Sequence, residues 1–181
     1  VGPIAVSPSL GTDFLKELKD HVGLATVVLD VAHGDSKKAL DYAEQCVRAG
    51  FHVVSANICT KDAARRYANV GVNIYRVGVG SGAACTTRTV AGVGVPQLTA
   101  IQDIFQWDST KFIISDGGIT GSGDIVKALA AGADAVMCGH ILAGAKEAPG
   151  QRMIEHDGTP RKTFRGMASW SALSENGKDV V

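Results

Sequence analysis

Short apolar runs recur along the chain and alternate with amphipathic segments. Six runs have the length of a β-strand, at residues 4–6, 26–29, 52–55, 74–77, 112–115 and 135–138. Most of them are continuously apolar, a pattern typical of parallel strands that are buried on both faces. The pattern therefore predicts a sheet of parallel strands.

Segments with a helical hydrophobic period separate these strands. They fall at residues 13–21, 36–49, 61–70, 96–105, 122–131 and 141–145. A strand and a helix thus repeat about every 20 to 30 residues, which predicts an α/β fold, either a barrel or an open parallel sheet. The hydrophobic pattern alone does not choose between these two architectures.

The composition fits a single domain over residues 1–181. The chain is 45% apolar, and its 181 residues suffice for a sizeable core. Eighteen basic residues balance eighteen acidic ones, so no charge excess predicts a nucleic acid as partner. No apolar stretch reaches the roughly 20 residues of a membrane helix, and no signal peptide is evident. We expect a cytoplasmic protein with a small-molecule partner and no contact with a membrane.

A cysteine in a glycine-rich loop is the strongest chemical signal in the sequence. After the predicted strand at residues 74–77, the loop reads Gly78-Val-Gly-Ser-Gly-Ala-Ala-Cys85-Thr-Thr-Arg88. The glycines let the backbone turn sharply and leave Cys85 at the carboxyl end of a strand. The thiolate is the nucleophilic form of cysteine, and Arg88 or the loop amides could lower the pKa of the thiol. A cysteine that only fills the loop is the alternative.

The other three cysteines have no such surroundings. Cys46 lies in a helical pattern and Cys138 in a strand pattern, where a small buried hydrophobic residue is the expected role, and Cys59 follows a strand. None of the spacings predicts a disulfide framework or a zinc site.

The start of the glycine loop also satisfies the G-x-G-x-x-A fingerprint of dinucleotide-binding folds. That fingerprint needs a helix to open at once, so that its amino terminus meets the pyrophosphate. Gly92, Gly94 and Pro96 argue against such a helix here. We therefore expect no Rossmann-type site in this loop.

Polar residues at the ends of other strands are candidate ligand contacts. Asp116, followed by Gly117 and Gly118, ends a predicted strand, where a carboxylate can bind two ribose hydroxyls and bare backbone amides can approach a phosphate. Asn57 and Asp30 follow two earlier strands. For each of these residues, ordinary turn or helix-cap chemistry is the alternative.

Several motifs in a fixed order resemble the IMP dehydrogenase/GMP reductase family of purine nucleotide oxidoreductases. Besides the Cys85 loop they are Leu29-Asp-Val-Ala-His-Gly34, Ser55-Ala-Asn57, Ser115-Asp-Gly-Gly-Ile-Thr-Gly-Ser-Gly-Asp124, Ala133-Asp-Ala-Val-Met-Cys-Gly139 and Phe164-Arg-Gly-Met167. The resemblance implies an eight-stranded TIM barrel with its active site at the carboxyl ends of the strands.

Aligned on these motifs, the six predicted strands correspond to the third to eighth strands of the barrel. The first two strands, the regulatory CBS domains and the catalytic flap of the family have no counterpart among residues 1–181. Because an open barrel exposes strand edges and core, we expect a fragment, a truncated gene or a domain that another segment completes.

The resemblance also implies roles for individual residues. Cys85 would attack C2 of the purine, and Thr87 would assist proton transfer, with a turn or cap role as its alternative. The carbonyl oxygens of Gly80, Gly82 and Cys85 would bind a monovalent cation, K⁺ in most relatives. The remaining implied contacts are Asp30 for the nicotinamide cofactor, and Asn57, Asp116, Gly117, Gly118, Gly139, His140, Gly166 and Met167 for the nucleotide.

Three positions depart from the family pattern. Ala83, His140 and Phe164 stand where the family usually has serine, serine and tyrosine, whose hydroxyls bind the substrate phosphate. Each lost hydrogen bond to a charged group is worth about 1.5–3 kcal/mol, so we expect the substrate phosphate to be bound more weakly. A protonated His140 could replace part of it. The alternative is a ligand other than a standard nucleoside monophosphate.

Three functions remain open at this point. The loop at residues 88–97 and the segment at residues 122–132 favour an IMP dehydrogenase, which oxidises IMP to XMP with NAD. The hairpin pattern at residues 152–164 resembles instead the NADPH-dependent GMP reductases, but Trp170 occupies the place of their usual catalytic glutamate. A catalytically inactive nucleotide-binding or assembly module is the third possibility. Members of the family are typically homotetramers.

Overall fold

The computed structural model describes residues 2–22, 26–31, 33–164 and 166. Six short strands form a curved sheet in which the spatial order equals the sequence order, and all neighbours run parallel. The strands are β1 (Ile4–Val6), β2 (Thr26–Leu29), β3 (His52–Val54), β4 (Ile74–Val77), β5 (Phe112–Asp116) and β6 (Ala135–Met137). The six predicted strands are therefore confirmed, three with the same bounds and three that differ by one residue.

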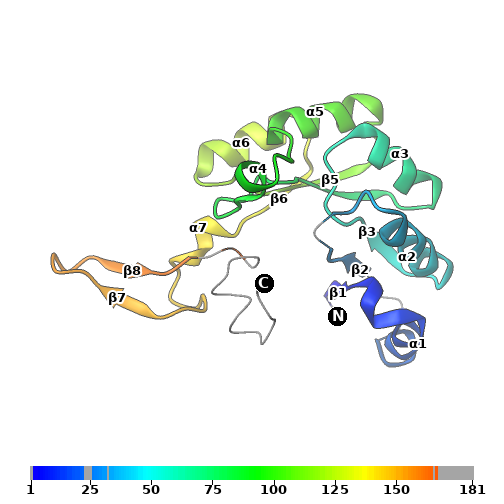
Figure 1. Cartoon of the computed structure of the whole chain (residues 1–181), viewed down its shortest axis with the longest axis horizontal. Coiled ribbons are helices and arrows are strands. Elements are labelled where there is room, and N and C mark those ends of the chain that lie inside the picture. Colours follow the sequence, from blue (N-terminus) through cyan, green and yellow to red (C-terminus); the bar gives the residue numbers. More distant parts are fainter. Residues whose placement is uncertain (1, 23–25, 32, 165, 167–181) are drawn as a thin grey trace.

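Helices lie between successive strands and pack on the convex side of the sheet (Figure 1). They are α1 (Gly11–Val22), α2 (Lys37–Arg48), α3 (Lys61–Asn69), α5 (Gln97–Trp107) and α6 (Ser122–Ala130). The short α7 (His140–Ala143) follows β6 and lies near the end of the sheet. Side chains at their amino ends set some of the starts: Ser36 accepts a hydrogen bond from the amide of Ala39, and Thr60 from that of Ala63.

Along the longer strands, side chains alternate between two environments. In β4, Tyr75 and Val77 are fully buried, and the Tyr75 ring lies 6.5 Å from that of Trp107 at the end of α5. Ile74 and Arg76, which point the other way, are only half-buried. The same alternation occurs in β2 and β5. The main core therefore lies between the sheet and the helices, whereas the concave face is partly open.

The curled parallel sheet with its outer helices is a partial TIM barrel, as the resemblance implied. Within the described residues, β1 and β6 each pair on one side only. That residues 1–181 form a single domain, and that another segment completes the barrel, stay predictions. No helix among the described residues is long and apolar enough to cross a membrane.

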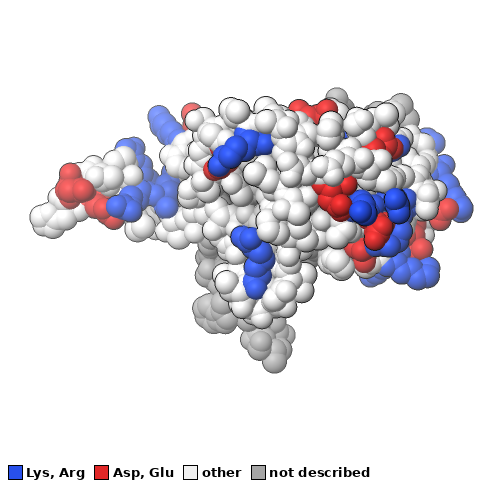
Figure 2. Space-filling model, turned by 90° about the horizontal axis from the view of Figure 1, so that it is seen from above, with Lys and Arg blue, Asp and Glu red and all other residues white. Residues whose placement is uncertain are grey.

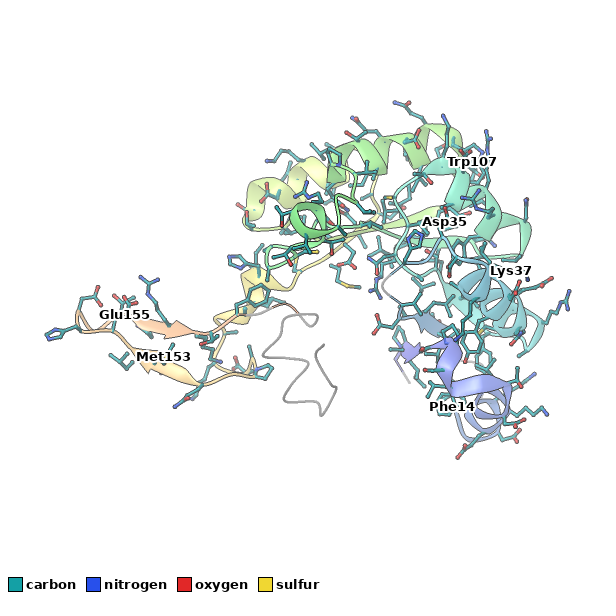
Figure 3. All side chains as sticks on the ribbon, viewed as in Figure 1. Phe14, Asp35, Lys37, Trp107, Met153 and Glu155 are labelled. Atoms are coloured by element: carbon teal, nitrogen blue, oxygen red, sulfur yellow. The ribbon has the colours of Figure 1, made fainter. Side chains whose placement is uncertain are left out.

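Beyond α7 the chain forms a hairpin of β7 (Arg152–Ile154) and β8 (Pro160–Lys162), which extends away from the sheet (Figure 1). The Asp157-Gly158 turn joins its strands, and Asp157 accepts a hydrogen bond from the amide of Thr159. Met153 and Glu155 project from it into solvent (Figure 3). The strand-Asp-Gly-strand pattern of the sequence is thus confirmed.

Charged side chains of both signs are mixed on the face that Figure 2 shows. Several of them form pairs, such as Arg66 of α3 with Asp35 before α2, whose carboxylate receives two hydrogen bonds at 2.8 and 2.5 Å. Asp35 is labelled in Figure 3 at the upper end of α2. This mixing agrees with the zero net charge of the sequence.

Candidate active site

Residues that the sequence analysis selected gather at one rim of the sheet. Asp30 follows β2, Asn57 lies beyond β3, the Cys85 loop follows β4, and Asp116 is the last residue of β5. Because the strands are parallel, their carboxyl ends share this rim, where TIM-barrel enzymes have their active sites. The fold therefore brings together residues that are up to 86 positions apart.

Asp116 is held by two side chains from neighbouring elements. The amide nitrogen of Asn57 donates hydrogen bonds to Oδ2 of Asp116 and to the carbonyl of Gly78, each at 2.8 Å. Nε of Arg76 lies 3.0 Å from the same carboxylate oxygen. Among the described residues, the other oxygen of Asp116 accepts no hydrogen bond, so it is available to a ligand hydroxyl.

The Cys85 loop is built directly on the Asp116 turn. The hydroxyl of Ser81 donates to the backbone carbonyl of Asp116 at 2.8 Å. A Cβ atom on Gly117 would lie 2.5 Å from Oγ of Ser81 and 2.9 Å from the amide nitrogen of Gly82. This close approach, besides its positive φ, explains why residue 117 is glycine. Gly118 also has a positive φ of 76°, but its Cβ would find only ordinary contacts.

Cys85 is exposed, and its surroundings stabilise the thiolate. Sγ lies 3.1 Å from Oγ1 of Thr87. Hydrogen bonds from the side chain and the backbone of Thr87 lower the pKa of the thiol below its usual value, with a smaller contribution from the charge of Arg88. The expectation that Arg88 and the loop amides lower this pKa is therefore confirmed, but the Thr87 side chain contributes most.

A single helical turn, α4 (Thr87–Val90), begins two residues after Cys85. The sequence analysis expected no helix here, and this expectation is wrong for these four residues. The turn ends before Gly92, as the glycines predicted. Thr87 occupies its first position, and Thr86, the residue before it, makes no side-chain cap.

The other cysteines differ from Cys85 in both exposure and pKa. Cys46 in α2 is fully buried, and burial raises the pKa of its thiol to about 11. Burial also raises the pKa of Cys59. Cys138, just beyond β6, is half-buried. The prediction of a buried Cys46 is thus confirmed. Of the four thiols, only that of Cys85 combines exposure with a lowered pKa.

The carbonyls proposed for a monovalent cation lie on the same loop. The carbonyl of Gly82 accepts a hydrogen bond from the amide of Cys85 at 2.9 Å, which leaves its second lone pair for a cation. Gly80 has a positive φ of 76°, and Arg88 packs against it. Among the described residues, no group of three His, Cys, Asp or Glu side chains forms a metal site. Carbonyl oxygens are ligands of the type that hard cations take.

The rim continues beyond β6 to residues near the hairpin. Gly139 precedes α7, and the ring of His140 contacts that of Phe164 edge-on at 5.4 Å. Gly166 lies against the Cys85 loop, since a Cβ on it would be 3.1 Å from the carbonyl oxygen of Ala84. Met167 and Trp170 lie outside the described residues.

The comparison with protein families agrees with the fold. Residues 7–181 match the family model of the IMP dehydrogenase / GMP reductase domain. The chain belongs to this family. It is 44% identical over 187 residues to an inosine-5'-monophosphate dehydrogenase of Aquifex aeolicus, covering 96% of this chain and 37% of the relative. The corresponding enzyme of Thermoplasma acidophilum is 48% identical over 158 residues, covering 86% of this chain and 32% of the relative.

A Streptococcus pyogenes inosine-5'-monophosphate dehydrogenase is 47% identical over 162 residues, which cover 87% of this chain and 32% of that protein. The chain thus spans about a third of the length of the curated relatives that it matches.

Two of the departures from the IMP dehydrogenase/GMP reductase pattern, His140 and Phe164, touch each other, so these two side chains form one local feature.

Two residues of the site were missed by the sequence analysis. Arg76 interrupts an apolar strand, and Ser81 lies among glycines. A charged residue within a strand that is predicted to be buried on both faces was the available signal for Arg76, because such a charge needs a partner. The role of Ser81 depends on a backbone carbonyl 35 positions away, for which the sequence carries no signal.

Proposed function

We propose that this chain carries the catalytic residues of an IMP dehydrogenase, which oxidises IMP to XMP with NAD. The proposal rests on Cys85, an exposed thiol of lowered pKa on a loop that Ser81 ties to the Asp116 turn. A nucleophile and a candidate ribose-binding carboxylate are thereby fixed relative to each other. The names of the relatives support the choice of IMP.

The nucleotide would lie along the rim between these two groups. The free oxygen of Asp116 would accept hydrogen bonds from the ribose hydroxyls, and the amides of Gly117 and Gly118 would approach the phosphate. Gly139 and His140 would complete the phosphate contacts. We also propose that Gly166 and Met167 contact the purine edge. The proximity of Gly166 to Ala84 supports this proposal for Gly166.

The chemistry proceeds through a covalent bond to sulfur. The Cys85 thiolate bonds to C2 of the purine, and the hydrogen on C2 departs as hydride with its bonding electron pair. NAD, when bound, supplies the hydride acceptor. A water oxygen then bonds to C2 of the resulting thioimidate, the C2–S bond breaks with its electron pair returning to sulfur, and XMP is released together with one proton.

Thr87 has two roles in this scheme. Its hydroxyl and amide stabilise the thiolate before attack, which raises the fraction of reactive Cys85 at neutral pH. Once sulfur is bonded to the purine, the hydroxyl, which lies 3.1 Å from Sγ, would accept a hydrogen bond from the attacking water and so assist the transfer of its proton to solvent. Asp30, whose side chain is 64% exposed at the rim, would bind the nicotinamide ribose.

The second candidate is a GMP reductase, which uses NADPH to deaminate GMP to IMP. The β7–β8 hairpin, which has the strand-Asp-Gly-strand form of those enzymes, favours it. Both reactions would use the same thiolate. The proposal further includes a K⁺ ion at the carbonyls of Gly80, Gly82 and Cys85, and a homotetramer as the active assembly.

The test is the reaction of the protein, as its gene encodes it, with 6-chloropurine ribonucleoside monophosphate. Attack by a thiolate displaces chloride and leaves the nucleotide on sulfur, which intact mass detects. We expect a single adduct that IMP suppresses, that Cys85→Ala abolishes and that Cys59→Ala retains. A folded protein that forms no adduct would favour the inactive module instead.

Turnover then separates the two enzymatic candidates. An IMP dehydrogenase forms NADH from IMP and NAD, with a rate that falls when K⁺ is replaced by an inert cation. A GMP reductase consumes NADPH in the presence of GMP and leaves IMP with NAD unreacted. Adduct formation without either turnover would contradict the proposed enzyme and leave a nucleotide-binding protein.

A further inference from the structure

One guanidinium group joins two carboxylates across the rim. Nη2 of Arg76 lies 3.3 Å from Oδ1 of Asp30, and its Nε lies 3.0 Å from Oδ2 of Asp116. The three residues come from β4, from the end of β2 and from β5, so the contact spans most of the concave face. The Arg76 side chain is 15% exposed, whereas those of Asp116 and Asp30 are 22% and 64% exposed.

Arg76 carries the positive charge that lies between the carboxylates of Asp30 and Asp116. Two carboxylates at one rim repel each other, and a largely buried guanidinium between them offsets this repulsion. The neutral amide of Asn57 adds a hydrogen bond to Asp116. No other cation among the described residues is paired with Asp30 or Asp116. Arg76 is therefore the cation that both carboxylates share within the described part of the chain.

The contact to Asp116 is close but incompletely bonded. Although Nε of Arg76 lies 3.0 Å from the carboxylate oxygen, its N–H is buried and makes no hydrogen bond within the described residues. A buried donor without an acceptor is unfavourable, and a small rotation of the Asp116 carboxylate would provide one. The contact of Nε of Arg76 with Asp116 is thus an ion pair without a hydrogen bond.

We propose that Arg76 is a positioning residue that holds the two ribose-binding carboxylates, Asp116 for the mononucleotide and Asp30 for the dinucleotide, in their binding orientations. This inference rests on the proposed function, because it takes the roles of the two carboxylates from there. Arg76 acts through them, so its removal weakens the binding of both ligands, and it does so only while the respective carboxylate is present.

The test is a set of double-mutant cycles in the protein as its gene encodes it. Dissociation constants are measured for IMP and NAD by calorimetry, with Arg76→Gln, Asp30→Asn, Asp116→Asn and the paired variants. We expect Arg76→Gln to weaken each ligand about tenfold. In the Asp116→Asn background it should no longer weaken IMP, and in the Asp30→Asn background it should no longer weaken NAD.

Two further variants keep the result interpretable. Arg66→Gln removes an exposed ion pair with Asp35 and should leave both dissociation constants unchanged. Arg76→Lys keeps the charge but loses the planar fork that reaches both carboxylates, so we expect it to fold and to retain the affinity for one ligand more than for the other. Equal retention or loss of both affinities in this variant would contradict the bridge.

Different experimental results would overturn the positioning role of Arg76 and the proposed function. Full additivity in both cycles, or an Arg76→Gln protein that binds both ligands as the unmodified protein does, overturns the positioning role while the proposed enzyme stands. An unmodified protein that binds neither IMP nor NAD overturns the proposed function, and the positioning role falls with it.

Discussion

Gly78 is the position at which one added methyl group should separate the nucleophile from the nucleotide site. It is buried at the start of the Cys85 loop, with φ at +148°, and its carbonyl accepts a hydrogen bond from Asn57. A Cβ atom built on it would lie 1.9 Å from the carbonyl oxygen of Asp116. The variant Gly78→Ala therefore forces the loop and the turn apart.

The size of the effect follows from this distance. Real Cβ atoms do not approach a heavy atom closer than 3.0 Å, so the Asp116 carbonyl must move by about 1.1 Å, the difference between the two distances. A misplacement of about 1 Å can cost roughly 100-fold in rate. The unfavourable φ adds about 1–3 kcal/mol of backbone strain, which lowers the free energy of unfolding.

The assay compares two reagents on the same thiol. We expect Gly78→Ala to lower the rate of the reaction of Cys85 with 6-chloropurine ribonucleoside monophosphate about 100-fold. The rate with iodoacetamide, which needs no nucleotide site, should change only a few-fold. Gly123→Ala is the matched control, because a Cβ there meets nothing within 4 Å and residue 123 lies in α6. A folded Gly78→Ala protein with an unchanged nucleotide rate would refute the reasoning.

Two other substitutions test the thiolate and the core. Thr87→Val removes the hydrogen bond that lowers the pKa of Cys85 most, so the alkylation rate should reach its plateau at a higher pH, whereas Thr89→Val should leave the profile unchanged. Tyr67→Phe removes the buried hydroxyl that donates a hydrogen bond to the Gly34 carbonyl at 2.9 Å. It should lower the free energy of unfolding, measured in urea, by about 1–3 kcal/mol. An unchanged midpoint of urea unfolding would contradict this expectation.

The strands could be predicted from their composition, because runs of apolar residues are the segments that the fold buries. The helices cover one face of the sheet and the concave face is only partly open, so most strand residues are apolar, and all six predicted runs became strands. The helices followed from their hydrophobic period. The one-turn α4 escaped prediction because four residues are too few to carry a period, and its formation depends on the turn from Gly82 to Cys85 that precedes it.

The side of the fold that carries the site could also be predicted, but its internal contacts could not. Polar residues after parallel strands must meet at one rim, which located Asp30, Asn57, Cys85 and Asp116 correctly relative to the sheet. The sequence does not state which of them touch. Asn57 uses its amide hydrogens on Asp116 and Gly78, contacts that a prediction from residue type alone did not contain.

The contacts of Arg76 with Asp30 and Asp116 show how the curvature of the sheet affects the geometry of the candidate site. Asp30 directly follows β2 and Arg76 belongs to β4. The two strands are separated by β3, that is, by two strand spacings of about 4.8 Å each in a flat sheet. Inward curvature brings the concave side chains of such strands closer together. An open sheet, covered by helices on both faces, would instead bury Arg76 beneath a helix and away from Asp30. The curvature that makes this sheet part of a barrel therefore shortens the span that the Arg76 side chain bridges to reach Asp30 at 3.3 Å.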